Sequence, residues 1–224
     1  MRKSALYRVL KPGVALALSA VLAIALYAGP RKKKANGSFS YYMLVLSYAP
    51  DFCAQPQGVK DPRECGSGRH VGFVVHGLWP QGDDSRGPEN CGSVSPVSKD
   101  VISATLKYIP TESLIQHEWK AHGSCSGQTA DAYFAQLRKA RDSVKIPGDL
   151  DQPTQLLQLS PAELLSKAAA ANPSFPAEAF RVSCYPNADL QELRVCFNKD
   201  LSPRACGSSA GQCSAGKVAL KAVR

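Results

Sequence analysis

Two of the four histidines in this 224-residue chain lie in one short stretch beside a carboxylate. The stretch QHEWKAHGSCSG, from Gln116 to Gly127, contains His117, Glu118 and His122. A zinc peptidase would place two histidines four residues apart on one helical face. Here the histidines are five apart, so about 100° per residue turns them roughly 140° from each other, and they cannot easily share a metal. Glu118 and His122, four residues apart, face the same way, and His117 borders the same cleft from its edge.

A third histidine follows an apolar run in FVVHGLWPQG, from Phe73 to Gly82. Two histidines on opposite sides of a cleft suit a reaction in which one proton is removed and another is donated. Imidazole can do both near neutral pH. We therefore predict that His76 faces the pair formed by Glu118 and His122, in a site without metal or cofactor. Gly77 would leave room for substrate, and Trp79 offers a face on which a nucleobase could stack.

A carboxylate and a third donor between two histidines suit a phosphorus centre that gains charge in its transition state. Other chemistries fit the sequence less well. The eight cysteines include no CxxC pair for zinc. A serine or cysteine hydrolase built on HGSCSG lacks a GxSxG elbow, and Cys125 is better explained as half of a disulfide bond. His70, alone near the start of its strand, is expected to be structural.

The elements that position these residues indicate an α+β fold, since strands precede and follow a helical block. We expect strands at Ser38–Pro50 and Arg69–Trp79 and a hairpin at Phe180–Asp200 around a PNAD turn. Helices are expected at Val97–Ile109, Thr111–Gly123, Thr129–Val144 and Leu159–Ala171.

Several residues predict where these helices begin and end. Pro110 ends the first helix and Gly123 closes the second. The third is expected to be more exposed. Ser160 caps the fourth, with Pro161 in its first position and Glu163 completing a capping box.

The net charge of +9 belongs to the start of the chain. Residues 1–34 carry eight lysines or arginines and no acid, which leaves 19 basic against 18 acidic residues elsewhere. A site for a polyanion must therefore be local. The apolar run of residues 13–29 between these cations predicts either a cleaved export signal or an N-terminal membrane anchor.

We therefore expect a leader in residues 1–35 and one catalytic domain in residues 36–224. The eight cysteines favour four disulfide bonds in an oxidising compartment, either the periplasm or the outside of the cell.

The motifs HGLWP and HEWxxHGxC, about 40 residues apart, resemble those of the ribonuclease T2 family. The resemblance covers roughly Phe39 to Cys213. It implies a central antiparallel sheet flanked by helices and stapled by disulfides. It also implies metal-independent cleavage of single-stranded RNA, not DNA, through a 2′,3′-cyclic phosphate, by a chain that we expect to be a monomer.

The resemblance also implies roles. His122 would be the base that takes the 2′-hydroxyl proton, and His76 the acid that protonates the leaving 5′-oxygen. Glu118 and His117 would hold and stabilise the phosphate, and Trp79 would help hold a base. The implied disulfides are Cys53–Cys65, Cys91–Cys125, Cys184–Cys213 and Cys196–Cys206.

The chain departs from the family pattern at a few positions. Ala121 stands where the family commonly has a lysine, and Lys120, one residue earlier, is not expected to be catalytic. Ser47–Tyr48 and Leu114–Ile115 replace residues that contribute to base pockets in relatives, so we expect little base specificity. A catalytically idle relative that only binds RNA is the alternative, although all the expected catalytic positions are filled.

Overall fold

The computed structural model describes residues 38–58, 62–66, 68 and 70–223. The chain divides between Ala35 and Asn36, and the description below concerns the unit Asn36–Arg224. The predicted leader and its apolar run of residues 13–29 lie outside the described residues. Within the described part of the chain, no helix is long and apolar enough to cross a membrane.

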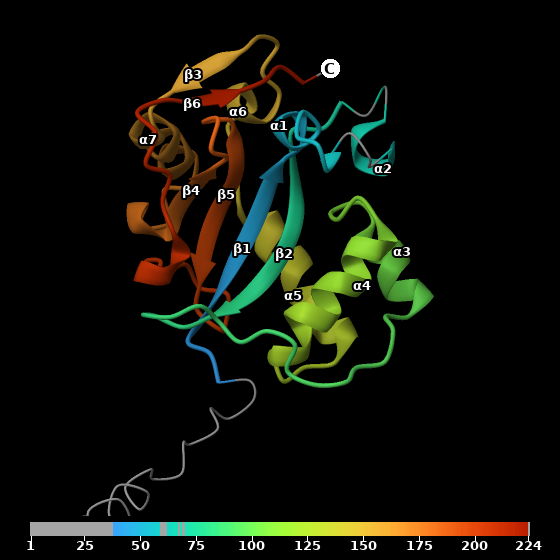
Figure 1. The fold of residues 1–224 in the computed structure, drawn as a ribbon. Coiled ribbons are helices and arrows are strands. Elements are labelled where there is room, and N and C mark those ends of the chain that lie inside the picture. The colour runs from blue at the N-terminus through green and yellow to red at the C-terminus, as the bar shows by residue number, and fades with distance from the viewer. Residues whose placement is uncertain (1–37, 59–61, 67, 69, 224) are drawn as a thin grey trace, which may run out of the picture. The chain divides into compact units, whose positions relative to one another are not determined.

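A four-stranded antiparallel sheet forms the centre of the fold, in the order β2-β1-β5-β4 (Figure 1). Its strands are β1 Tyr41–Tyr48, β2 Phe73–Gln81, β4 Phe180–Cys184 and β5 Leu190–Phe197. The predicted strands and the hairpin are therefore confirmed, as is the α+β class. A second sheet pairs β3 Leu157–Leu159 with β6 Val218–Leu220. The sequence did not predict it, because three residues are too few to show a period of two.

Helices surround this sheet, and α3, α4 and α5 gather beside its β2 edge in Figure 1. The α-helices are α1 Ala49–Phe52, α2 Pro62–Cys65, α3 Lys99–Thr105, α4 Glu112–Ala121, α5 Ala130–Ser143, α6 Gly148–Asp151 and α7 Pro161–Ala171. Short 3₁₀ helices are η2 Gly123–Cys125, η3 Ala177–Ala179 and η4 Ser208–Ala210. All four predicted helices are present, and Ser160 and Glu163 form the predicted capping box of α7.

Three expectations about the helices need correction. Helix α3 ends at Thr105, so Pro110, five residues further on, does not end it. Gly123 does not close α4 but begins η2, and a Cβ there would lie 2.3 Å from the Trp119 ring. Glycine is thus required by close packing at this position. Helix α5 is exposed on one face only, because Tyr133, Phe134 and Leu137 on its other face are fully buried.

Strand β1 is buried on both faces of the sheet. Tyr42, Leu44 and Leu46 face the main hydrophobic core, which the helices cover. Met43 and Val45 alternate with them and face a smaller cluster, which Trp79 packs against from β2. The face of the sheet that carries this smaller cluster is also the face that borders the candidate site described below.

Four disulfide bonds link the described cysteines, and they are the pairs that the family resemblance implies: Cys53–Cys65, Cys91–Cys125, Cys184–Cys213 and Cys196–Cys206. The bond between Cys91 and Cys125 joins the loop after β2 to η2, just beyond α4. The two histidine motifs are thus linked covalently as well as by packing.

Candidate active site

An irregularity in β2 decides where His76 points. Opposite β1, Val45 pairs with Gly77 while Leu46 pairs with Val75, so His76 is an extra residue that forms a β-bulge. The bulge changes which residues share a face of the strand. Val75 and Leu78, three residues apart, both lie in the main core.

As a consequence, His76 and Trp79 lie together on the other face of the sheet. Their rings meet edge to face, with centroids 5.1 Å apart. Strict alternation along the strand would have placed these two side chains on opposite faces. The bulge therefore brings the histidine and the tryptophan of HGLWP to one site.

Gly77 lets the carboxylate of α4 approach β2 closely. A Cβ at this position would lie 1.9 Å from Oε2 of Glu118 and 2.6 Å from Nε1 of Trp79. The space beside Gly77 is thus taken by Glu118, and the prediction that substrate would fill it is wrong. Any larger residue here would push the two motifs apart.

Glu118 is fully buried between the helix and the strand. The Trp79 indole donates a hydrogen bond of 2.8 Å to its Oε2. Its Oε1 lies 3.6 Å from Nε2 of His76 and has no hydrogen-bond partner among the described residues. Burial raises the pKa of Glu118 to about 7, although the positive charge of His76 and the hydrogen bond from Trp79 oppose the rise.

His76 lies between two carboxylates and is still 32% exposed. Its Nε2 faces Glu118, and its Nδ1 lies 3.3 Å from Oε1 of Glu192 on β5. Burial alone would lower the pKa of His76. The hydrogen bond with Glu192 and the negative charges of Glu118 and Glu192 outweigh that effect and hold the pKa above its usual value.

The surroundings of His122 lower its pKa, whereas those of His76 raise the pKa of that ring. It follows the last residue of α4 as its C-cap and is almost fully buried. Its ring stacks on the Trp79 indole, with centroids 4.9 Å apart and planes 25° from each other. Its Nδ1 has no hydrogen-bond partner within the described part of the chain. Burial lowers the pKa of His122 to about 4, and the positive charges of His76 and His117 act in the same direction.

The structure thus brings together four of the five predicted site residues: His76, Trp79, Glu118 and His122. The fifth, His117, is exposed on α4 and acts on His122 through its charge. His70 is exposed and makes no contact with this group that the structure records. Trp79 has a role beyond the predicted one, because its indole holds Glu118 and supports the His122 ring.

Two residues near the site were not predicted from the sequence. Glu192 and Arg194 lie on β5, two residues apart on the same face, and form an ion pair of 2.7 Å. The signal in LQELRVCF was present, because charged and apolar residues alternate there and one face of the strand is therefore polar. Without the strand pairing, nothing connected that face with His76.

Comparisons with known proteins identify the family of this chain. A family model described as the Ribonuclease T2 family matches residues 39–206. A probable ribonuclease of Haemophilus influenzae is 32% identical over 188 residues, which is 79% of this chain and 64% of that protein. A ribonuclease of Aeromonas hydrophila is 29% identical over 195 residues, covering 80% of this chain and 78% of that protein. The chain therefore spans less than two thirds of the Haemophilus relative and more of the Aeromonas one.

A solved structure shows the same fold. The RNase-related protein from Calystegia sepium superposes with a TM-score of 0.66 and 21% identity, covering 84% of this chain and 99% of that one. The predicted antiparallel sheet with its flanking helices is therefore confirmed. Since the family model also covers well over half of the sequence, including both histidine motifs, the chain belongs to the ribonuclease T2 family.

Proposed function

We propose that this protein is an exported, metal-independent endoribonuclease that cleaves single-stranded RNA through a 2′,3′-cyclic phosphate. Membership of the ribonuclease T2 family and the similarity to bacterial ribonucleases support an RNA endonuclease. The observation that carries the mechanism is a pair of histidines beside one buried carboxylate, with pKa values moved in opposite directions. Environments that separate two titratable groups in this way are typical of an acid and a base.

His122 fits the role of the general base. A pKa of about 4 keeps its ring neutral in weakly acidic and neutral solution, so it can take a proton from the 2′-hydroxyl. The freed 2′-oxygen attacks the adjacent phosphorus and forms the cyclic phosphate. This route needs a 2′-hydroxyl, which is why we propose RNA and not DNA as the substrate.

His76 fits the role of the general acid. Its raised pKa keeps the ring protonated in weakly acidic solution, and its 32% exposure lets substrate reach it. The proton on Nε2 passes to the 5′-oxygen as the bond between phosphorus and that oxygen breaks. One proton is thus taken by His122 and one is given by His76, which leaves the total charge of the site unchanged.

Glu118 fits the role of a group that holds the phosphate between the two histidines. A pKa of about 7 leaves Glu118 largely protonated in acid, and its Oε1 has no partner among the described residues. A protonated carboxyl can donate to a phosphate oxygen as negative charge builds up there. The exposed His117 adds a donor at the edge, and Trp79 would help hold a base.

Export of the protein rests on its disulfide bonds and on the composition of its leader. Four disulfides are stable in an oxidising compartment and rare in the cytosol. We propose that residues 1–35 direct residues 36–224 to the periplasm or beyond, either as a cleaved signal or as an anchor through residues 13–29. The catalytic domain would then act as a monomer with little base specificity.

The activity is expected to depend on pH with a maximum in weak acid. kcat/KM should rise as pH increases through about 4, because His122 must lose its proton to act as the base. It should fall as pH increases through about 7 and through the raised pKa of His76, because Glu118 and the acid must both keep their protons. Steady-state rates on a dinucleotide between pH 3 and 9 would measure both limbs, and a maximum above pH 8 would contradict the assignment.

Product analysis on a panel of dinucleotides, with and without EDTA, tests the proposed function directly. We expect 2′,3′-cyclic phosphates from every sequence, at rates that differ little between bases and do not change with EDTA. Linear 5′-phosphate products, or an activity that EDTA abolishes, would overturn the mechanism. Binding of RNA without cleavage would indicate the catalytically idle relative instead.

A further inference from the structure

We infer that Glu192, held in place by Arg194, is a positioning residue that makes His76 the proton donor of the reaction. This inference rests on the proposed function, since it concerns the same site. Glu192 does not contact the reacting atoms itself, because Oε1 of Glu192 meets the Nδ1 side of the His76 ring, away from Glu118. It acts through the histidine.

The two carboxylate oxygens of Glu192 contact different residues. Oε1 lies 3.3 Å from Nδ1 of His76. Oε2 accepts two hydrogen bonds from Arg194, of 2.9 Å from Nε and 2.7 Å from Nη2. These two charge-assisted bonds hold Oε2 in place, and the contact with His76 holds Oε1. The Glu192 side chain is 5% exposed, so water does not compete strongly for either oxygen.

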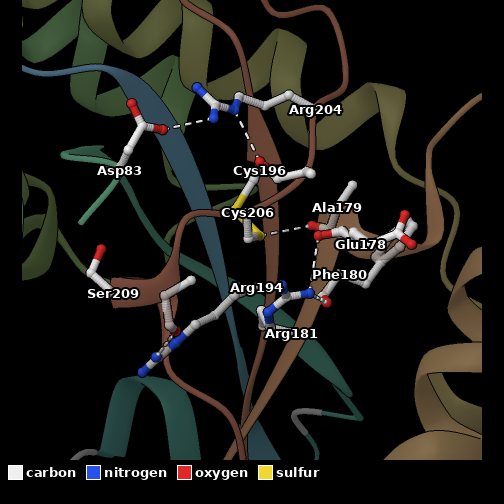
Figure 2. The surroundings of a disulfide bond; sticks show 12 residues. Asp83, Glu178, Ala179, Phe180, Arg181, Arg194, Cys196, Arg204, Cys206 and Ser209 are labelled. Atoms are coloured by element: carbon white, nitrogen blue, oxygen red, sulfur yellow. Dashed lines mark hydrogen bonds and ion pairs between the residues drawn. A yellow bond between two sulfur atoms is a disulfide. The ribbon is translucent and has the colours of Figure 1, made fainter. Parts of the chain in front are cut away.

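Arg194 is in turn held by a segment that follows β5 in the chain. Its Nη1 donates to the carbonyl oxygen of Ala210 at 2.5 Å. Ala210 belongs to η4, which follows Cys206, and the Cys196–Cys206 bond ties that segment to β5 (Figure 2). Gly211 adds a further constraint, because a Cβ there would lie 2.9 Å from Nη1 of Arg194.

A continuous series of contacts therefore links the Cys196–Cys206 bond, through Arg194 and Glu192, to the His76 ring. Figure 2 shows Arg194 beside the Cys196–Cys206 bond and separate from Arg204, which pairs with Asp83 at 2.7 Å. If the ion pair of Glu192 with Arg194 served stability alone, the second oxygen of Glu192 would not need to lie against a nitrogen of His76. The contact of Glu192 with His76 thus indicates a part in the chemistry.

The contact decides which ring nitrogen gives up its proton. A hydrogen bond at one nitrogen of an imidazole fixes the tautomer of the neutral ring. Because Glu192 accepts from Nδ1, the neutral ring of His76 keeps that proton, and the proton on Nε2 is the one that leaves. Nε2 is the nitrogen that faces Glu118 and the place proposed for the phosphate.

The charges around His76 agree with this role. Three carboxylates raise its pKa: Glu192 from β5, Glu118 from α4 and Glu64 from α2. Burial would raise the pKa of Glu192, but the hydrogen bond with His76 and the positive charges of Arg194 and His76 outweigh burial and hold it below its usual value. Glu192 therefore stays ionised in the weakly acidic range where Glu118 takes up its proton.

The decisive variant is Glu192→Gln, which keeps the shape of the side chain and removes its charge. We expect the pKa of His76, followed by NMR of its ring protons, to fall by about one unit. The falling limb of kcat/KM should move to lower pH by the same amount, and the rising limb set by His122 should stay in place. Activity at pH 7.5 would then drop about tenfold, with a much smaller loss near pH 5.

A matched control is Glu112→Gln, since Glu112 is an exposed glutamate in the first turn of α4. It should leave both limbs and the pKa of His76 unchanged. A folded Glu192→Gln protein with an unchanged His76 pKa, or with equal losses at pH 5 and pH 7.5, would overturn the inference.

A measurement on the unmodified protein keeps the inference testable if the variant does not fold. Nitrogen-15 shifts of the His76 ring, recorded above its pKa, should show the proton on Nδ1; a proton on Nε2 would overturn the inference. This result is independent of activity. If cyclic phosphates form while the proton sits on Nε2, the inference fails and the proposed function stands. If the proton sits on Nδ1 and no cyclic phosphate forms, the proposed function fails instead.

Discussion

Replacing His122 or His76 by alanine is expected to lower kcat/KM for RNA by about 10²–10⁴-fold, while the protein still folds. General acid–base groups contribute about this much to the rate. His122→Ala removes the neutral ring that accepts the 2′-hydroxyl proton, and His76→Ala removes the charged ring that protonates the leaving oxygen. Because each variant keeps one of the two groups, His122→Ala should lose the rising limb of the pH profile, and His76→Ala should keep only the part of the falling limb that Glu118 sets.

The matched control for these variants is His70→Ala, since His70 is an exposed histidine with no recorded contact to the site. It should cleave RNA at the wild-type rate. The double variant of His76 and His122 should be about as slow as the slower single variant, because groups that act as a unit do not add. Near-full activity in either single variant would remove that histidine from the mechanism.

The sequence identified the family of the protein better than the geometry of its candidate site. The two histidine motifs are long enough to identify the family, and the spacing of Glu118 and His122 correctly put them on the same side, where both contact Trp79. The bulge at His76 could not be predicted, because an extra residue in a strand appears only when its partner is known. The same is true of Glu192, which reaches His76 across β1 from a strand 116 residues later.

Signals from residues that are neighbours in the sequence predicted the helices. They failed at positions where contacts with other parts of the fold determine which residue is required. The capping box of α7 depends only on neighbouring residues, and it is present as predicted. Gly123 looked like a helix terminator, yet its small size serves the Trp119 ring. Gly77 looked like space for substrate, yet it admits Glu118. For both glycines, the neighbour that requires the missing Cβ is contributed by another part of the chain or by the previous turn.

Replacing Gly77 by alanine is the second variant with a large expected effect. The new Cβ would lie 1.9 Å from Oε2 and 2.7 Å from Cδ of Glu118, and 2.6 Å from Nε1 of Trp79. Glu118 is fully buried and cannot swing into solvent, so β2 and α4 must move apart and the bond from Trp79 to Glu118 must lengthen or break. We expect a loss of about 1–3 kcal/mol in the free energy of unfolding, as for other overpacked cores.

The same movement should reduce kcat/KM by about 100-fold, since a displacement of about 1 Å at a reacting group can cost that much. Activity measured well below the melting temperature separates this effect from unfolding. Gly148→Ala is the control, because a Cβ at the start of α6 would meet nothing within 4 Å, and both stability and activity should stay close to wild type. If Gly77→Ala cleaves RNA and melts like the wild type, Glu118 does not lie against β2, and its proposed role in holding the phosphate must be dropped.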